Sequence, residues 1–112
     1  MADSKPFSPL VQQYADACRQ VRTLSAELLE KTGYTGSQSL VLSAIAQSPG
    51  CTQAHVVQVS GIDRSTTSDV VARLKKRGLI SRTSGHDGRA WNLKLTSLGE
   101  IAYTKITQVA AE

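Results

Sequence analysis

Residues 63–77 combine short hydroxyl side chains with arginines in a pattern suited to contacting nucleic-acid bases. At a helical step of 100°, the apolar or small side chains of one arc would pack inward, and these are Thr67, Val70, Val71 and Leu74. The outward arc and its flanks comprise Arg64, Ser65, Thr66, Ser68, Asp69, Ala72, Arg73 and Lys76. Short side chains let a helix approach base edges in the major groove of DNA, which is ~12 Å wide, and arginine can bind guanine through two hydrogen bonds. The segment therefore predicts a DNA-contacting helix, and a surface helix rich in serine and threonine is the alternative.

Asp69 does not fit this pattern simply, because phosphates would repel a carboxylate on the outward arc. It could accept a hydrogen bond from the amino group of a cytosine. It could instead pair with Arg73, four residues later on the same helix, and leave the bases alone. We expect the pairing with Arg73.

Positive charge is concentrated around this segment. The 112 residues carry 13 Lys and Arg against 9 Asp and Glu, a net charge of +4. Residues 1–59 hold four basic and four acidic side chains, whereas residues 60–95 hold eight basic and three acidic ones, a net charge of +5. A basic field confined to one third of the chain is typical of a surface that binds a polyanion, and a solvated charged face is the alternative.

The elements that must position these residues form a helix-turn-helix over about residues 52–77, followed by a wing over about residues 79–95. Thr52 is expected to cap a short helix that ends at Ser60 and Gly61. Asp63 caps the next helix, which Gly78 closes in a left-handed conformation. The wing consists of a strand LISRT, a loop SGHDGR and a strand AWNLKL whose side chains alternate between two faces.

Further DNA contacts are expected outside the fourth helix. Arg89, beside the wing loop, would reach the minor groove, whose negative potential attracts guanidinium groups; the alternative is a solvated charge at a hairpin tip. Asp87 would orient Arg89 or Arg73 rather than contact DNA. Thr52 and Gln53 would hold a phosphate at the start of the third helix.

Two helices flank this unit. The first, about residues 9–31, is ~33 Å long and carries an apolar stripe with a second apolar shoulder that includes Cys18. Ser37 is expected to cap the second helix. The last helix, about residues 97–111, is capped by Thr96 and has an apolar side. That side comprises Leu98, Ile101, Ala102 and Val109. One small domain cannot cover both helices, so they predict a homodimer.

The chain also resembles the MarR family of bacterial transcription regulators. The resemblance rests on DRSTTSDVVARLKKRGLISR, on Asp87-Gly88-Arg89 and on LKLTSLGE, which together fill the family's Asp-x-Arg and Leu-Thr-x-x-Gly signature. It extends from about Ser37 to Glu100 and implies a homodimer on a pseudo-palindromic operator, with repression relieved by a small ligand or by oxidation. Members usually carry a further C-terminal dimerisation helix, whereas this sequence ends at Glu112, so the usual dimer geometry is not assumed.

The cysteine content adds one candidate site. Two cysteines, Cys18 and Cys51, do not make a disulfide framework, which favours a reducing cytoplasm. Some regulators of the MarR type sense peroxide through a cysteine in the first helix, which makes Cys18 a candidate redox residue. Arg19 and Arg22 are near enough in sequence to lower its pKa. Packing as a small hydrophobic side chain is the favoured interpretation of Cys18.

Taken together, the sequence predicts a single domain, residues 1–112, that is mainly α-helical with a small antiparallel β-hairpin wing. It predicts no enzyme, cofactor, metal site, membrane span or secretion signal, because no motif or spacing for any of these occurs. The predicted function is regulation of transcription through double-stranded DNA. The alternatives are a winged-helix adaptor that binds protein without binding DNA, and a thiol or ligand sensor with secondary DNA binding.

Overall fold

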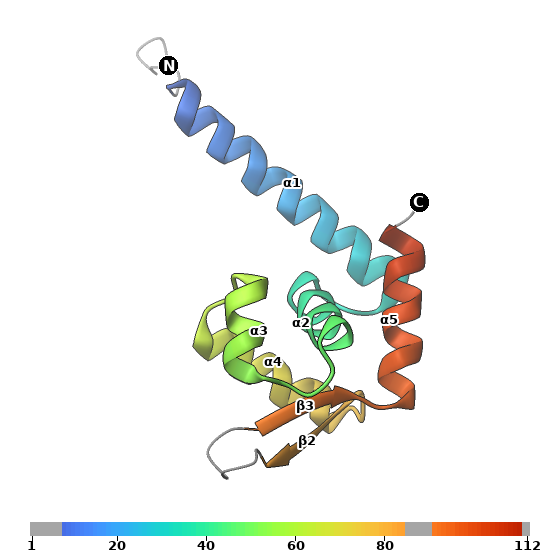
Figure 1. Cartoon of the computed structure of the whole chain (residues 1–112). Helices are drawn as coiled ribbons and strands as arrows, with labels where there is room; N and C mark the ends of the chain where they lie inside the picture. Colours follow the sequence, from blue (N-terminus) through green and yellow to red (C-terminus); the bar gives the residue numbers. More distant parts are fainter. Residues whose placement is uncertain (1–7, 85–90, 111–112) are drawn as a thin grey trace.

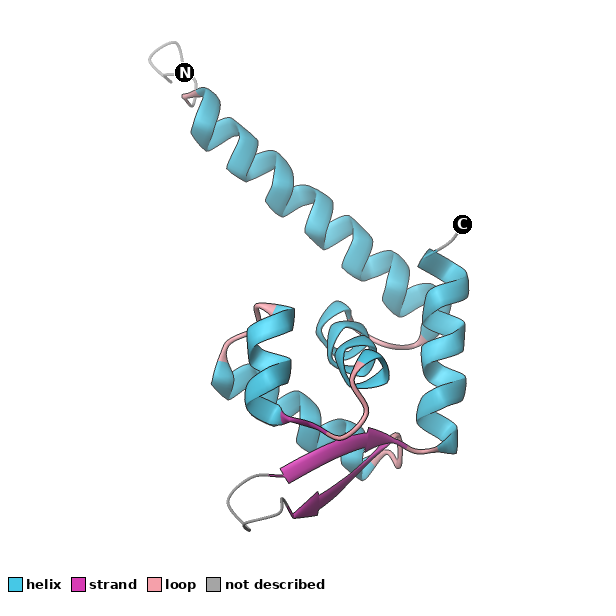
Figure 2. Cartoon of the chain, in the orientation of Figure 1, coloured by secondary structure: helices cyan, strands magenta, loops and turns pink. Residues whose placement is uncertain are grey.

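The computed structural model describes residues 8–84 and 91–110, and it is mainly helical with a small antiparallel sheet, as predicted (Figures 1 and 2). The elements are, in chain order, α1 (Pro9–Thr32), α2 (Gly36–Gln47), β1 (Cys51–Thr52), α3 (Gln53–Ser60), α4 (Arg64–Lys76), β2 (Ile80–Ser84), β3 (Trp91–Leu95) and α5 (Ser97–Ala110). Helices α3 and α4 form the helix-turn-helix. Strands β2 and β3 form the two sides of the wing, and the loop between them, with Asp87 and Arg89, lies outside the described residues.

The sheet has three strands in the order β1-β3-β2, one more than the sequence predicts. Strands β2 and β3 pair antiparallel from Ile80 with Leu95 to Ser84 with Trp91, as expected for a hairpin. The additional strand β1 pairs Cys51 with Leu93. It is only two residues long, so it has no alternation of side chains that a sequence pattern could reveal. The strand arises because the start of α3 is held against the wing.

The second helix begins earlier than expected. Thr35, and not Ser37, is its N-cap: the Thr35 hydroxyl accepts a hydrogen bond from the Gln38 backbone N–H at 3.1 Å. The Gln38 side chain accepts one from the Thr35 N–H at 3.0 Å in return. This reciprocal pair satisfies two backbone donors, whereas capping by Ser37 would satisfy one, so the helix starts at Gly36.

Helix α1 projects from the body for most of its length, and its C-terminal part lies beside α5 (Figure 1). The radius of gyration is 17.2 Å, against roughly 13 Å for a globular chain of this size. The apolar stripe of α1 is therefore open to solvent: Tyr14 is 73% exposed, Val21 60% and Leu24 58%. Cys18 and Leu28 are half-buried.

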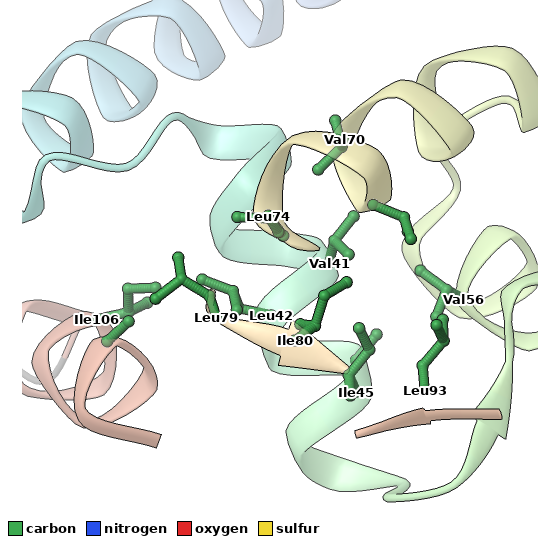
Figure 3. Close-up of a cluster of buried hydrophobic side chains, with 13 residues drawn as sticks. Val41, Leu42, Ile45, Val56, Val70, Leu74, Leu79, Ile80, Leu93 and Ile106 are labelled. Carbon is green, nitrogen blue, oxygen red and sulfur yellow. The ribbon is translucent and has the colours of Figure 1, made fainter. Parts of the chain in front are cut away.

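The core lies between α2, α4, the sheet and α5 (Figure 3). Helix α2 is buried at its centre through Val41, Leu42 and Ile45. The predicted inward arc of α4 is buried as expected and comprises Thr67, Val70, Val71 and Leu74. The other arc of α4 therefore has a fixed orientation toward solvent.

The apolar side predicted for α5 is divided between the core and the solvent. Ala102 and Ile106 are buried and Val109 is half-buried, whereas Leu98 is 58% exposed and Ile101 65% exposed. Its rotation is set at the first turn by Gly99, where an added Cβ would lie 2.0 Å from the backbone oxygen of Leu79. That close approach turns the Gly99 side of the helix toward the core and leaves Leu98 and Ile101 outside.

Candidate nucleic-acid interface

A short, tightly bonded turn positions the first turn of α4. Gly61 ends α3 in the left-handed conformation with φ of 74°. Asp63 then caps α4, because its carboxylate accepts a hydrogen bond from the Thr66 backbone N–H at 3.1 Å. Thr67, fully buried, faces the turn, and its hydroxyl lies 3.4 Å from the backbone oxygen of Ile62. The start of the outward arc is therefore held by hydrogen bonds on the inward side.

The residues predicted to contact DNA from α4 are all exposed along one helix, and they are Arg64, Ser65, Thr66, Ser68, Arg73 and Lys76. The side chains of the first two turns are short apart from Arg64, and the longer cations gather in the last turn, where they also complement the helix dipole. The surface can therefore approach a base edge closely at one end and contact phosphates at the other.

The predicted pair between Asp69 and Arg73 is wrong, since within the described residues these two side chains form no ion pair. Both side chains are exposed. A solvent-exposed pair on a helix contributes only a few tenths of a kcal/mol, which does not offset the cost of ordering two side chains. The Asp69 carboxylate therefore faces solvent on the side of α4 where the DNA bases would lie.

Thr52 and Gln53 lie at the start of α3, where the sequence predicts a contact with a DNA phosphate. The Thr52 hydroxyl accepts a hydrogen bond from the His55 backbone N–H at 3.1 Å, which leaves its own proton available to an acceptor. Gln53 and Arg64 line one hollow of about 250 Å³ between α3 and α4, together with Ala54 and Val57. The structure thus brings a residue from each helix of the motif to one site, which their sequence positions do not reveal.

Strand pairing adds a residue that sequence reasoning missed. On the wing, Lys94 is paired in register with Ser81, and both side chains are exposed. The alternation of β3 supports this placement, because Leu93 is buried and Leu95 half-buried on the other face, as predicted. Lys94 therefore adds an exposed cation on the described part of the wing.

The C-terminal end of α4 carries a contact that the sequence could not show. The guanidinium carbon of Arg77 lies 4.7 Å from the ring centre of Tyr34, which stands between α1 and α2. A guanidinium over an aromatic face at this distance is attracted by the negative face of the ring. Arg77 is thus directed to the protein body rather than to the outward arc.

The remaining polar candidates do not assemble into another site. Cys18 and Cys51 are free and half-buried. Burial raises the pKa of the Cys51 thiol, which makes it a poorer nucleophile near neutral pH. In residues 8–84 and 91–110, no group of three or more His, Cys, Asp or Glu side chains is placed to hold a metal ion. Nor does any helix there have the length and apolar character to cross a membrane.

Comparison with known proteins agrees with this geometry. The chain is 33% identical over 88 residues to a protein of Thauera aromatica described as a transcriptional regulatory protein for the hcr operon, an alignment that covers 78% of the chain. It spans 53% of that relative, about half its length. The PcaV transcriptional regulator from Streptomyces coelicolor, solved with its natural ligand, matches with a TM-score of 0.78 at 28% identity, over 96% of this chain and 79% of that one.

A transcriptional regulator from Pseudomonas aeruginosa matches with a TM-score of 0.77 at 27% identity, over 91% of this chain and 80% of that one. A model of the MarR family matches residues 32–90, more than half of the chain. The matched residues include the whole helix-turn-helix and β2. The chain belongs to the MarR family.

Proposed function

We propose that the protein is a sequence-specific regulator of transcription that binds double-stranded DNA as a homodimer and represses from a pseudo-palindromic operator. The observation that carries this proposal is the outward arc of α4, which is short, polar and basic while the opposite arc is buried. Entry into the major groove requires a helix that is packed against the protein on one side and carries short side chains on the other.

In this docking, α4 lies in the major groove and the wing lies over the adjacent minor groove, where Arg89 inserts. Thr52 and Gln53 bind a phosphate at the start of α3, and Arg64 contributes from α4, since it lines one hollow with Gln53. Asp87 orients an arginine of the wing or of α4. The whole chain is then one DNA-binding domain, with residues 52–77 as the motif and residues 79–95 as the wing.

The homodimer is supported by α1, whose apolar stripe remains open to solvent along the part that leaves the body (Figure 1). We place the dimer contact on α1 and α5, where Leu98 and Ile101 are also exposed. Two symmetric copies would present two α4 helices to successive major-groove segments, with half-sites about 10 bp apart. We place this action in the bacterial cytoplasm.

Relief of repression by a small molecule belongs to the same proposal. A groove of about 250 Å³ separates α1 from α2, and its lining consists of Val21, Leu24, Ser25, Leu28, Gly36, Ser37 and Leu40. The solved structure of PcaV contains its natural ligand, which supports an effector for this chain as well. The groove is mostly apolar, so a small ligand with an apolar body and few polar groups fits its chemistry.

Two substitutions separate the roles of wing and recognition helix. Thr66→Ala should reduce discrimination between operator and scrambled duplex by ~1–3 kcal/mol while it leaves affinity for the scrambled duplex nearly intact. Arg89→Ala should weaken binding to both duplexes and reduce the magnitude of the salt slope by about two in the homodimer, because it removes one phosphate-neutralising charge from each protomer. The measurement is a fluorescence titration of each variant on an operator selected from random duplexes, at several salt concentrations.

A different result would contradict each of these two predictions. Equal losses on both duplexes for Thr66→Ala would make α4 a phosphate clamp rather than a reader of bases. Unchanged binding of both duplexes by Arg89→Ala would remove the wing from the DNA. Arg64→Ala is a less clean probe, because Arg64 also borders the phosphate hollow shared with Gln53.

Cys18 allows the thiol-sensor alternative to be tested separately. Iodoacetamide should modify Cys51 slowly near neutral pH, since burial raises its pKa and the thiolate is the reactive form. A Cys18→Ser variant isolates Cys51, whose labelling rate should rise with pH and stay below that of the unfolded chain. Equal rates in folded and unfolded chains would contradict the burial of Cys51. With Cys51→Ser as background, loss of DNA binding after alkylation of Cys18 would favour the sensor.

A further inference from the structure

The three residues that follow α4, residues 77–79, are held from two sides by different parts of the chain. On the helix itself, the Gly78 N–H donates to the Lys75 oxygen and the Leu79 N–H to the Leu74 oxygen, both at 3.0 Å. This pair of bonds, with Gly78 at φ of 79°, ends the helix and reverses the chain. The C-terminal end of α4 is therefore joined to the rest of the chain at this junction.

Helix α5 holds the junction from one side. The Thr96 hydroxyl donates to the Gly78 backbone oxygen, and the Thr96 N–H donates to the Leu79 oxygen at 3.0 Å. The same hydroxyl accepts the Gly99 N–H at 3.1 Å, so Thr96 caps α5 as predicted while it ties α5 to α4. All of these bonds involve at least one backbone group, and Gly99 packs directly on the Leu79 carbonyl. This side of the junction is rigid.

The segment after the C-terminal end of α1 contacts the junction from the other side, through the aromatic ring of Tyr34. The Thr32 hydroxyl donates to the Leu28 oxygen and accepts the Tyr34 N–H at 3.1 Å, which fixes the turn between α1 and α2. The ring of Tyr34 packs partly against the core, and the Arg77 guanidinium lies over it. Arg77 is the C-cap of α4, and its side chain is exposed.

The two sides differ in kind. The α5 side can change only if backbone hydrogen bonds break, whereas the α1 side is a single side-chain contact at the surface. A movement of α1 carries Tyr34 with it, because only Gly33 separates Tyr34 from α1 and Thr32 binds across that residue. The Arg77 end of α4 is thus where a change in α1 can reach the recognition helix without breaking the backbone hydrogen bonds of the α5 side.

We infer that Tyr34 is a positioning residue for DNA binding, and this inference rests on the proposed function. Its ring holds Arg77 and so sets the angle at which the C-terminal end of α4 meets the major groove. Arg77 serves as the tether rather than as a phosphate contact. The arrangement of the α1 helices in the dimer is transmitted to both recognition helices through this contact, which makes Tyr34 a determinant of specific rather than total DNA affinity.

The test compares wild type, Tyr34→Leu and Tyr34→Phe, each alone and combined with Arg77→Gln, on operator and scrambled duplex. Tyr34→Leu should lower operator affinity ~3-fold or more, the scale of an exposed cation–π contact, and leave scrambled-duplex affinity unchanged. Tyr34→Phe keeps the ring and should restore wild-type binding. In the Arg77→Gln background, Tyr34→Leu should have no further effect, because the tether is already absent. The salt slope should not change on Tyr34→Leu, which alters no charge.

Each contrary result is distinct. A wild-type protein that binds no duplex overturns the proposed function and this inference together. If wild type binds but Tyr34→Leu lowers only the melting temperature, or lowers operator binding equally in the Arg77→Gln background, the ring is a packing residue and the inference fails. Should Tyr34→Leu not fold, Arg77→Gln alone decides: an unchanged ratio of operator to scrambled affinity overturns the inference. An equal loss of affinity for both duplexes on Arg77→Gln is one case of an unchanged ratio, and it would mark Arg77 as a phosphate contact.

Discussion

A Gly99→Ala substitution is expected to lower the free energy of unfolding by about 3 kcal/mol or more, the largest stability effect that we predict for one added methyl group. The added Cβ would lie 2.0 Å from the Leu79 backbone oxygen and 3.2 Å from the Leu95 Cβ. The Leu79 oxygen cannot move away without loss of the hydrogen bond that it accepts from the Thr96 N–H, which joins α5 to the end of α4. The strain therefore cannot be relieved by a side-chain rotation.

Gly36→Ala is the matched control for this prediction. Its added Cβ would lie 2.8 Å from the Ser25 hydroxyl oxygen, which is the end of a side chain that can rotate away. Alanine is also the better helix former, so we expect a change within about 1 kcal/mol of wild type. Urea unfolding followed by circular dichroism, at one protein concentration throughout, measures both variants. Equal stabilities for Gly99→Ala and wild type would show that α5 does not pack on Leu79 as described.

A glutamate in place of Val21 is expected to dissociate the homodimer and to weaken operator binding by about 100-fold or more. Val21 is 60% exposed in the chain and lies in the middle of the apolar stripe of α1. In the proposed dimer that side chain is covered, so two symmetric copies would bury two unpaired carboxylates. Loss of the dimer then removes the gain from binding two half-sites at once.

Ala26→Glu adds the same charge on the opposite, exposed face of α1 and should leave both association and DNA affinity unchanged. Sedimentation measures the oligomeric state. A protein concentration of tens of micromolar is well above the dissociation constant of a dimer that dissociates at about 1 μM. A wild-type protein that sediments as a monomer there would contradict the proposed homodimer. Equal behaviour of Val21→Glu and Ala26→Glu would place the dimer contact elsewhere than on this stripe.

Features that depend on neighbouring residues could be predicted from the sequence. The caps Thr52, Asp63 and Thr96 and the left-handed Gly78 all follow from bonds that span three or four residues, and the structure confirms them. The two arcs of α4 were also predictable, because its 3.6-residue period separates Val70 and Leu74 from the polar side chains. The sequence shows the Leu-Thr-x-x-Gly segment as a motif, whereas its role at the junction of α4 and α5 is visible only in the structure.

Features that depend on contacts between distant segments could not be predicted. Strand β1 exists because Cys51 meets Leu93, and the contact of Tyr34 with Arg77 joins two different loops. The division of the apolar side of α5 between core and solvent could not be predicted, because it is set by the Leu79 carbonyl against Gly99, a backbone contact without a hydropathy signal. The DNA contacts of Arg89 and the redox role of Cys18 stay predictions.

If this basic surface binds duplex DNA, the affinity must fall steeply as the salt concentration rises. Fluorescence anisotropy of a labelled random duplex and of a selected operator would be measured from about 50 to about 200 mM salt. Each protomer has four cations that we assign to DNA, and these are Arg64, Arg73, Lys76 and Arg89. Eight such contacts with phosphates in the dimer predict a slope of log affinity against log salt near −7, a loss of about 10⁴-fold over this range. No binding to either duplex at the lowest salt would show that this surface does not bind DNA and would favour the protein-binding adaptor.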